Sequence, residues 1–177
     1  MKKILITALL AMTCATTVQA KTLVAYFTLT GNTQNAAKII AEETGADLYQ
    51  IELVTPYPLD YKGQIALAKK ELSENILPPI KELPKNIDEY DIIFVGSPVW
   101  WGTIATPVRT FLSSGSLKGK TVIPFVTHGS GGPDKSFTDT EKLCKGCQVK
   151  TNGWSGYNNL TPGLKKWAKK SSEEAQK

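Results

Sequence analysis

The sequence has a single histidine, His128, and only three cysteines, one of which, Cys14, lies within the first twenty residues. Two remaining thiols and one distant imidazole do not make the four ligands of a structural zinc site, so no metal centre is expected. Beyond the first segment, no apolar run is long enough to cross a bilayer. The net charge is only +5, the lysines are scattered, and there is no internal repeat or interdomain linker. These absences predict one globular domain and give no indication of nucleic-acid binding.

The first twenty residues have the pattern of a secretory signal peptide. Lys2 and Lys3 precede a short apolar run over residues 4–12, and Val18-Gln19-Ala20 places small residues at positions −3 and −1 of a cleavage site. We therefore expect export, to the periplasm, of a mature chain that starts at Lys21. Loss of the two lysines would lower the net charge from +5 to +3.

Apolar runs alternate with helical patterns along the rest of the chain, which is typical of a parallel sheet covered by helices. The expected strands are 21–27, 47–53, 91–97, 121–127 and 148–157, and the expected helices are 33–44, 61–77, 137–143 and those opened by Thr106-Pro107 (Thr106 as N-cap) and Thr161-Pro162. Residues 171–177 are expected to be a polar, frayed tail after a domain over 21–170. The fold class is α/β, a three-layer sandwich whose five-stranded parallel sheet has the order 2-1-3-4-5. That order places a ligand where strands one and three diverge.

The loop after the first expected strand, Thr28-Leu29-Thr30-Gly31-Asn32-Thr33, carries hydroxyl and amide side chains but no Lys or Arg. A helix N-terminus presents unpaired N–H groups and a partial positive charge, which can hold a phosphate. Gly31 lets the backbone approach such a ligand closely. Ordinary capping is the alternative, although a cap needs one such residue rather than four in six positions. We therefore predict a phosphate site here.

The loop after the third strand contains Pro98-Val99-Trp100-Trp101-Gly102. Neighbouring side chains of an extended segment point in different directions, so one tryptophan can pack inward while the other offers a flat face to a planar ligand. Burial of both rings in the core or in a homodimer interface is the alternative.

The loop after the fourth strand is Thr127-His128-Gly129-Ser130-Gly131-Gly132-Pro133. Its glycines permit close backbone contact with a ligand, although glycine-rich turns are also ordinary connectors. His128 is expected to be a polar loop residue rather than a catalyst. All three loops fall at the carboxyl edge of the predicted sheet, where ligands bind in α/β proteins.

Together these loops resemble those of the flavodoxin family. The loop Thr28–Thr33 follows the family's Thr/Ser-x-Thr-Gly-x-Thr pattern, and Gly96 to Gly102, followed by Pro107, is also similar. The stretch Pro56-Tyr57-Pro58-Leu59-Asp60-Tyr61 resembles a subgroup of short flavodoxin-like proteins. The resemblance covers residues 22–157, nearly the whole mature chain.

The resemblance implies that FMN is the cofactor. Thr28, Thr30, Asn32 and Thr33, with backbone N–H groups of the loop that includes Leu29 and Gly31, would bind its phosphate. The segment from Pro98 to Gly102 would flank the isoalloxazine ring, with Trp100 or Trp101 stacked on it. Thr127, Gly129, Gly131 and Gly132 would line its other edge. The redox chemistry would be that of the flavin, and one-electron transfer requires no acid or base from the protein.

The expected function is electron transfer through FMN in the cell envelope, with a redox protein or a small molecule as partner. The basic charge differs from that of many acidic electron-carrier flavodoxins, so different reductases are expected. The signal has Lys2-Lys3 rather than twin arginines, which indicates the Sec route, by which chains are exported unfolded. An unfolded chain cannot carry FMN, so the cofactor is expected to be loaded outside the cytoplasm.

Two alternatives are an FMN-dependent NAD(P)H:quinone or disulfide reductase and a binding protein that has kept the fold but lost the cofactor. The mature chain's two cysteines lie in Cys144-Lys-Gly-Cys147. They could be a redox pair that exchanges electrons with the flavin, a structural disulfide or two unpaired thiols.

Overall fold

The computed structural model describes residues 20–129, 131–133, 135–157 and 163–177. Residues 1–19 of the predicted signal peptide and the predicted helix start at Thr161-Pro162 lie outside these residues. Within the described ranges, no helix is both long enough and apolar enough to cross a bilayer.

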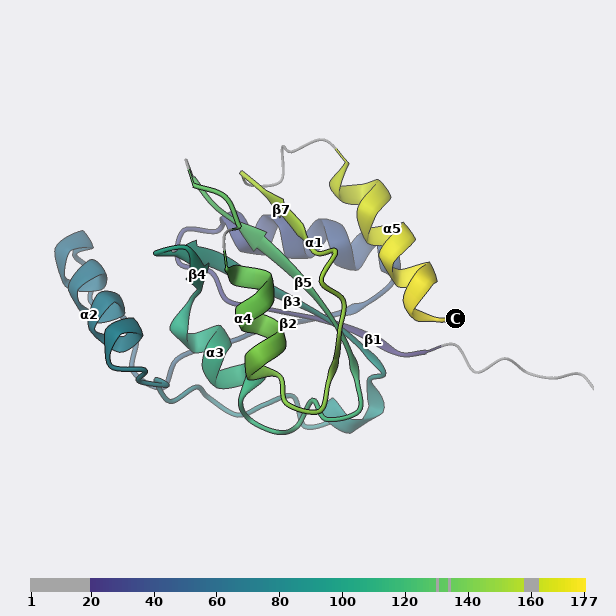
Figure 1. Ribbon diagram of the computed structural model, residues 1–177, viewed down its shortest axis with the longest axis horizontal. Coiled ribbons are helices and arrows are strands. Elements are labelled where there is room, and N and C mark those ends of the chain that lie inside the picture. Colours follow the sequence, from purple (N-terminus) through teal and green to yellow (C-terminus); the bar gives the residue numbers. More distant parts are fainter. Residues whose placement is uncertain (1–19, 130, 134, 158–162) are drawn as a thin grey trace, which may run out of the picture.

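A parallel sheet forms the middle layer of the molecule (Figure 1). Its principal strands are β1 (Thr22–Tyr26), β2 (Asp47–Gln50), β3 (Ile92–Trp100), β5 (Thr121–Thr127) and β6 (Gln148–Val149), and they lie in the order β2-β1-β3-β5-β6. The short β4 (Thr103–Ile104) pairs with the end of β3 in an antiparallel hairpin. When β4 is left out of the count, the predicted order 2-1-3-4-5 is confirmed.

Helices cover both faces of the sheet (Figure 1). On one face lie α1 (Asn32–Thr44) and α5 (Leu164–Ala175), and on the other lie α3 (Thr106–Leu112) and α4 (Ser136–Leu143). The 3₁₀ helix η1 (Ile87–Glu89) precedes β3. The remaining helix, α2 (Tyr61–Ser73), stands at the side of the molecule and buries only Ala68 and Glu71 among its thirteen residues.

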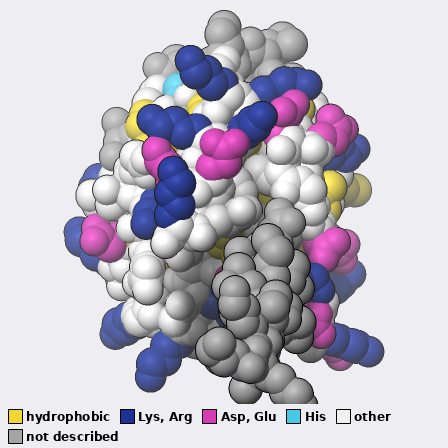
Figure 2. Space-filling view, turned by 90° about the vertical axis from the view of Figure 1, so that its right-hand side faces the viewer, with side chains coloured by type: hydrophobic (Ala, Val, Ile, Leu, Met, Phe, Trp, Pro, Cys, Tyr) yellow, Lys and Arg dark blue, Asp and Glu magenta, His cyan; other side chains and the backbone are white. Residues whose placement is uncertain are grey.

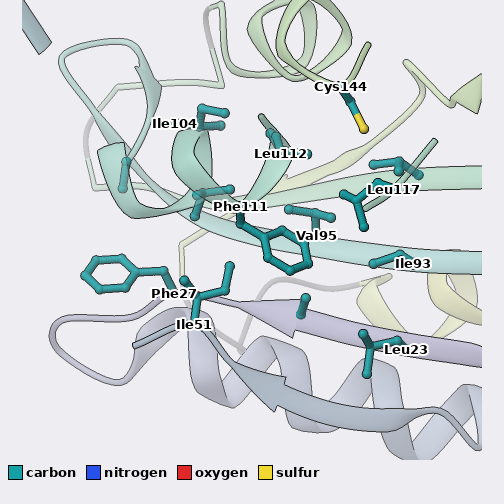
Figure 3. Packing of buried hydrophobic residues seen from close by; sticks show 14 of the residues in the cluster. Leu23, Phe27, Ile51, Ile93, Val95, Ile104, Phe111, Leu112, Leu117 and Cys144 are labelled. Atoms are coloured by element: carbon teal, nitrogen blue, oxygen red, sulfur yellow. The ribbon is translucent and has the colours of Figure 1, made fainter. Parts of the chain in front are cut away.

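Alternation along the strands divides the core into two clusters, because successive side chains of a strand point to opposite faces of the sheet. Leu23 and Phe27 of the β1 segment join Ile93, Val95 and Phe111 in the cluster under α3 (Figure 3). The intervening β1 residues Val24 and Tyr26 join the cluster under α1 and α5. The sheet is therefore buried on both faces, as its continuous apolar strands require.

The predicted fifth strand, 148–157, is interrupted. Its first part, β6, pairs with Thr121 and Val122 of β5, whereas β7 (Trp154–Gly156) pairs with Phe125 to Thr127. The carbonyl of Val122 accepts from Lys150 and the N–H of His128 donates to Gly156, so even-numbered residues of β5 face this neighbour. Between Val122, where the pairing with β6 ends, and Phe125, where the pairing with β7 begins, the even-numbered residue is Pro124, which has no N–H to donate, and the ladder breaks beside it.

Several predicted helix boundaries were wrong. The helix α2 ends at Ser73 rather than residue 77, and Asn75 beyond it has a φ of 54°. Thr106 is the first residue of α3 rather than its N-cap, because its hydroxyl is buried in a bond to Glu71. Most of the predicted tail, residues 171–177, is not frayed. The helix α5 continues to Ala175, and Ser171 and Ser172 are buried.

Figure 2 shows the end of the molecule opposite the loops that follow the strands. Basic and acidic side chains are interspersed on the visible part of this face. Ion pairs among the described residues include Lys165 with Glu43 at 3.0 Å and Lys21 with Glu89 at 2.7 Å. This mixed charge distribution is typical of a solvated surface.

Candidate functional site

The loops after β1, β3 and β5 meet at one edge of the sheet and enclose a cavity of about 290 Å³. This volume is at the lower end of the range for sites that hold small molecules. We call this space the loop cavity. It is lined by Thr28, Leu29, Thr30, Asn32, Thr33, Tyr61, Gln64, Pro98, Val99, Trp100, Thr127, His128, Gly129 and Tyr157.

The first loop turns sharply at Gly31, which has a φ of 88° and precedes α1. The N–H of Gly31 donates to the Thr28 hydroxyl at 3.0 Å. The N–H groups in the first turn of a helix have no partner within the helix, and no described side chain accepts from those of α1. A Cβ atom at Gly31 would meet no atom within 4 Å, so this backbone faces open space. The loop therefore presents free N–H donors and the positive end of a helix dipole to the cavity.

A hydrogen bond across the sheet fixes the start of α1. The Thr33 and Thr127 hydroxyls lie 2.8 Å apart, and both residues are buried. This bond joins the first helix to the end of β5. It explains why two residues 94 positions apart both line the loop cavity.

The two tryptophans have different environments. Trp100 is half-buried, and its ring makes edge-on contacts with Phe27 and Tyr57, at centroid distances of 5.8 and 5.6 Å. Trp101 is 51% exposed and has a φ of 48°. With Gly102, whose φ is 75°, it forms the two-residue turn of the β3–β4 hairpin. Positive φ at both positions is the requirement of a type I′ turn, and a bulky residue there is rare.

Not every predicted residue of the second and third loops lines the loop cavity. Gly129 does, whereas Gly102, Gly131 and Gly132 do not, within the part of the chain that the structure describes. The Gly102 carbonyl instead accepts from the N–H of Lys135 at the start of α4. A Cβ atom at Gly129 or Gly131 would meet no atom within 4 Å, so both leave room for a ligand.

A second cavity of about 280 Å³ adjoins the first and shares Leu29, Tyr61, Gln64, Val99 and Trp100 with it. Its remaining lining residues are Tyr57, Ile65, Ala68 and Trp101. We call it the apolar cavity, since its walls are mostly aromatic and aliphatic. A planar, apolar group would fit walls of this chemistry.

Sequence reasoning did not assign site roles to Tyr57, Tyr61, Gln64 or Tyr157. A signal was present for Tyr61 and Gln64. Asp60 accepts a hydrogen bond from the Gly63 N–H at 2.7 Å and so caps α2. An Asp just before a helical pattern predicts that the helix starts at Tyr61. Tyr61 and Gln64, three residues apart, then lie on the same face of that helix.

Glu71 of α2 is buried beside the apolar cavity and is held by two hydroxyl groups. Tyr57 and Thr106 each donate to its Oε2 atom, and their oxygens lie 2.8 Å apart. Burial raises the pKa of the Tyr57 hydroxyl well above its usual value, and the bond to Glu71 raises it further, against a lowering effect of Thr106. The phenol therefore stays protonated and acts as a donor. This cluster fastens α2 to the rest of the domain.

Cys144 and Cys147 form a disulfide at the end of α4. The disulfide is immediately followed by Gln148, which pairs with Thr121, the first residue of β5. The loop cavity lies at the other end of that strand, beside Thr127. At about 3.3 Å per residue, the two ends are about 20 Å apart. This separation prevents direct contact between the disulfide and a ligand in the loop cavity.

The described residues contain no group of three or more His, Cys, Asp or Glu side chains suited to holding a metal ion. His128 lines the loop cavity, and its Nδ1 atom lies 3.1 Å from the carbonyl of Gly129.

Comparison with known proteins identifies this arrangement. Residues 21–171 match the sequence profile of the flavodoxin family. The chain belongs to the flavodoxin family. This result confirms the resemblance that the three loops indicated.

Solved structures of flavodoxin-like proteins are similar over most of the chain. A protein from Bacteroides eggerthii described as a flavoprotein shares 33% identity, with 88% of this chain and 98% of that chain covered and a TM-score of 0.74. A flavoprotein from Lactobacillus acidophilus, solved in complex with FMN, shares 25% identity, with 84% and 99% covered and a TM-score of 0.69.

Proposed function

We propose that this protein is an exported FMN-dependent electron-transfer protein of the cell envelope. Family membership and the FMN complex of the Lactobacillus acidophilus relative support FMN as the cofactor. Bound FMN would supply one- and two-electron redox chemistry. The observation that carries the proposal is the uncapped N-terminus of α1 in a cavity that also contains the half-buried Trp100.

The residues of the loop cavity fit the parts of FMN. The hydroxyls of Thr28 and Thr30 and the free N–H groups after Gly31 would hold the phosphate, which needs donors rather than a cation at a helix N-terminus. Val99 and Trp100 line both cavities and would form an apolar wall for the ring. This surround would exclude water and so influence the reduction potential.

The test is spectroscopic. FMN added to the purified protein should bind with 1:1 stoichiometry. Binding should quench the fluorescence of FMN and shift its visible absorption bands. A reductive titration should then take up two electrons per FMN at potentials different from those of free FMN. Protein that takes up no FMN would refute the proposal.

Export is supported by the signal pattern and by the Cys144–Cys147 disulfide, because disulfides persist in oxidising compartments. Cell fractionation with N-terminal sequencing should find a mature chain that begins at Lys21. We further propose that FMN is loaded after export. Holoprotein isolated from the cytoplasm before export would contradict that step.

A flavin-dependent quinone reductase is the second candidate, favoured by the apolar cavity beside the loop cavity. Turnover of NAD(P)H with a panel of quinones, compared with equimolar free FMN, tests it. A disulfide reductase that uses Cys144 and Cys147 is disfavoured by their position at the opposite end of β5. Replacing both cysteines by serine would abolish the turnover of a disulfide reductase that uses them and would leave quinone reduction unchanged.

A further inference from the structure

A third cavity, of about 420 Å³, lies beyond Trp101. Trp101 lines both this cavity and the apolar cavity, so its exposed indole separates the two. The other walls come from α2, β4, α3 and α4 and include Lys69, Arg109, Lys135 and Asp139. We call this space the cationic cavity.

The charges around the cationic cavity do not balance. Lys69, Arg109 and Lys135 contribute three positive charges, and Asp139 contributes one negative charge. One carboxylate oxygen of Asp139 accepts a hydrogen bond from the buried Thr103 hydroxyl. None of the three cations forms an ion pair with the described residues, in contrast to the lysines paired elsewhere on the surface. Asp134 lies outside the described residues. The described lining thus carries an excess of two positive charges.

The three cations come from separate elements that are held in place. Lys69 is on α2, Arg109 is in the last turn of α3 and is half-buried, and Lys135 directly precedes α4. The N–H of Lys135 is bonded to the Gly102 carbonyl at 2.9 Å, next to Trp101. A solvated basic face usually follows one helix. Here the charges converge on one cavity instead, where they repel one another in the absence of an anion.

Trp101 adds an aromatic surface to this cavity. Its φ of 48° is costly for a residue with a Cβ atom, and its ring is half-exposed. Residues held in the left-handed region cluster at active sites and ligand sites. The cavity therefore combines an oxyanion-binding set with a flat apolar face.

We propose that the cationic cavity binds a small molecule with an aromatic ring that carries a phosphate group. A phosphate monoester has close to two negative charges at neutral pH, which matches the excess charge of the lining. Arg109 supplies a planar fork of donors for the phosphate oxygens, while Lys69 and Lys135 act as point charges. The ring lies against Trp101. This binding site is independent of the proposed electron transfer, although Trp101 brings its ligand next to the apolar cavity.

The test is isothermal titration calorimetry of the FMN-saturated protein with phenyl phosphate, inorganic phosphate and benzoate at one ionic strength. Saturation with FMN keeps the phosphate probes out of the Thr28–Thr33 loop. We expect phenyl phosphate to bind 1:1 with a Kd of about 1 mM or lower, more tightly than either of the other probes. Equal binding of benzoate would overturn the charge-matching argument, and no binding of phenyl phosphate would overturn the whole proposal.

Variants locate the site. Arg109→Gln and Lys135→Gln should each weaken phenyl phosphate binding about tenfold, because each loses a charge-assisted bond. Trp101→Ala should remove the preference for phenyl phosphate over inorganic phosphate. Lys166→Gln, an exposed lysine on α5, is the matched control and should change nothing. Unchanged binding in Arg109→Gln would refute the assignment.

Failure of this proposal and failure of FMN binding are distinguishable. If the protein takes up no FMN, the same titrations of the flavin-free protein still compare Arg109→Gln with the parent. Binding in the cationic cavity is sensitive to that change, whereas binding at the Thr28–Thr33 loop is not. Thermal unfolding of each variant shows whether it has folded.

Discussion

Gly31 provides the sharpest test of the phosphate loop, because a side chain placed there strains the backbone without a clash with neighbouring atoms. Its φ is 88°, and a Cβ atom placed on it would meet no atom within 4 Å. Gly31→Ala therefore causes no clash inside the protein, and its cost is that of a left-handed backbone with a side chain. That cost is about 1–2 kcal/mol.

Gly115 is a matched control. Its φ is 79°, a Cβ atom there would also meet no atom within 4 Å, and it lies in the turn between α3 and β5, away from the loop cavity. Gly115→Ala should therefore lower the stability of the flavin-free protein by a similar amount, about 1–2 kcal/mol. Urea denaturation of both variants measures this loss.

FMN affinity should separate the two variants. Relief of the strain at residue 31 moves the first N–H groups of α1, which are the proposed phosphate donors. Loss of one bond to a charged group weakens binding about tenfold or more. Gly115→Ala should keep the parent affinity. Quenching of FMN fluorescence gives both dissociation constants. If Gly31→Ala loses stability but binds FMN as tightly as Gly115→Ala, the assignment of this loop to the phosphate is refuted.

Three further predictions use other parts of the chain. Tyr57→Phe removes a donor from buried Glu71 and should cost about 1–3 kcal/mol in urea denaturation at neutral pH. The Tyr57 pKa is raised in the folded state, so the unfolded chain loses this proton first, near pH 10. The free energy of unfolding of the parent should therefore fall above that pH, and that of the variant should fall less steeply. Identical slopes of unfolding free energy against pH would contradict this. Opening the Cys144–Cys147 disulfide with the double serine variant should cost about 2 kcal/mol, with FMN affinity unchanged because the bridge lies at the far end of the sheet. Gly153→Ala would force its Cβ atom against the Pro124 carbonyl of the neighbouring strand and should cost roughly 1–3 kcal/mol, again without weakening FMN binding.

The sheet order and the meeting of the three loops could be predicted from the sequence, because continuous apolar strands and the loop pattern Thr28–Thr33 are local signals. The break beside Pro124 could not be placed, since it depends on which neighbour that residue faces. The hairpin at Trp101 was missed because a tryptophan does not signal a left-handed turn. Thr106 matched a capping pattern, but its hydroxyl is bonded to Glu71, 35 residues away, a contact that no local pattern contains.

The candidate site was predicted less completely than the fold. The first loop could be assigned because its chemistry is contained in six consecutive residues. The apolar cavity depends on where α2 packs, and the cationic cavity depends on three helices that are separate in the sequence. Sequence spacing carries no information about such convergence.

The sparse burial of α2 has a consequence for how a cofactor enters and leaves. Only Ala68 and Glu71 of this helix are buried, and Tyr61, Gln64, Ile65 and Ala68 form one side of the apolar cavity. A segment with so few buried contacts opens at a lower free energy than the central strands do. In hydrogen-exchange measurements its amides should exchange well before those of β3 and β5, and FMN should slow that exchange. The rate at which α2 opens would then limit the rate of FMN release, while the sheet stays folded throughout.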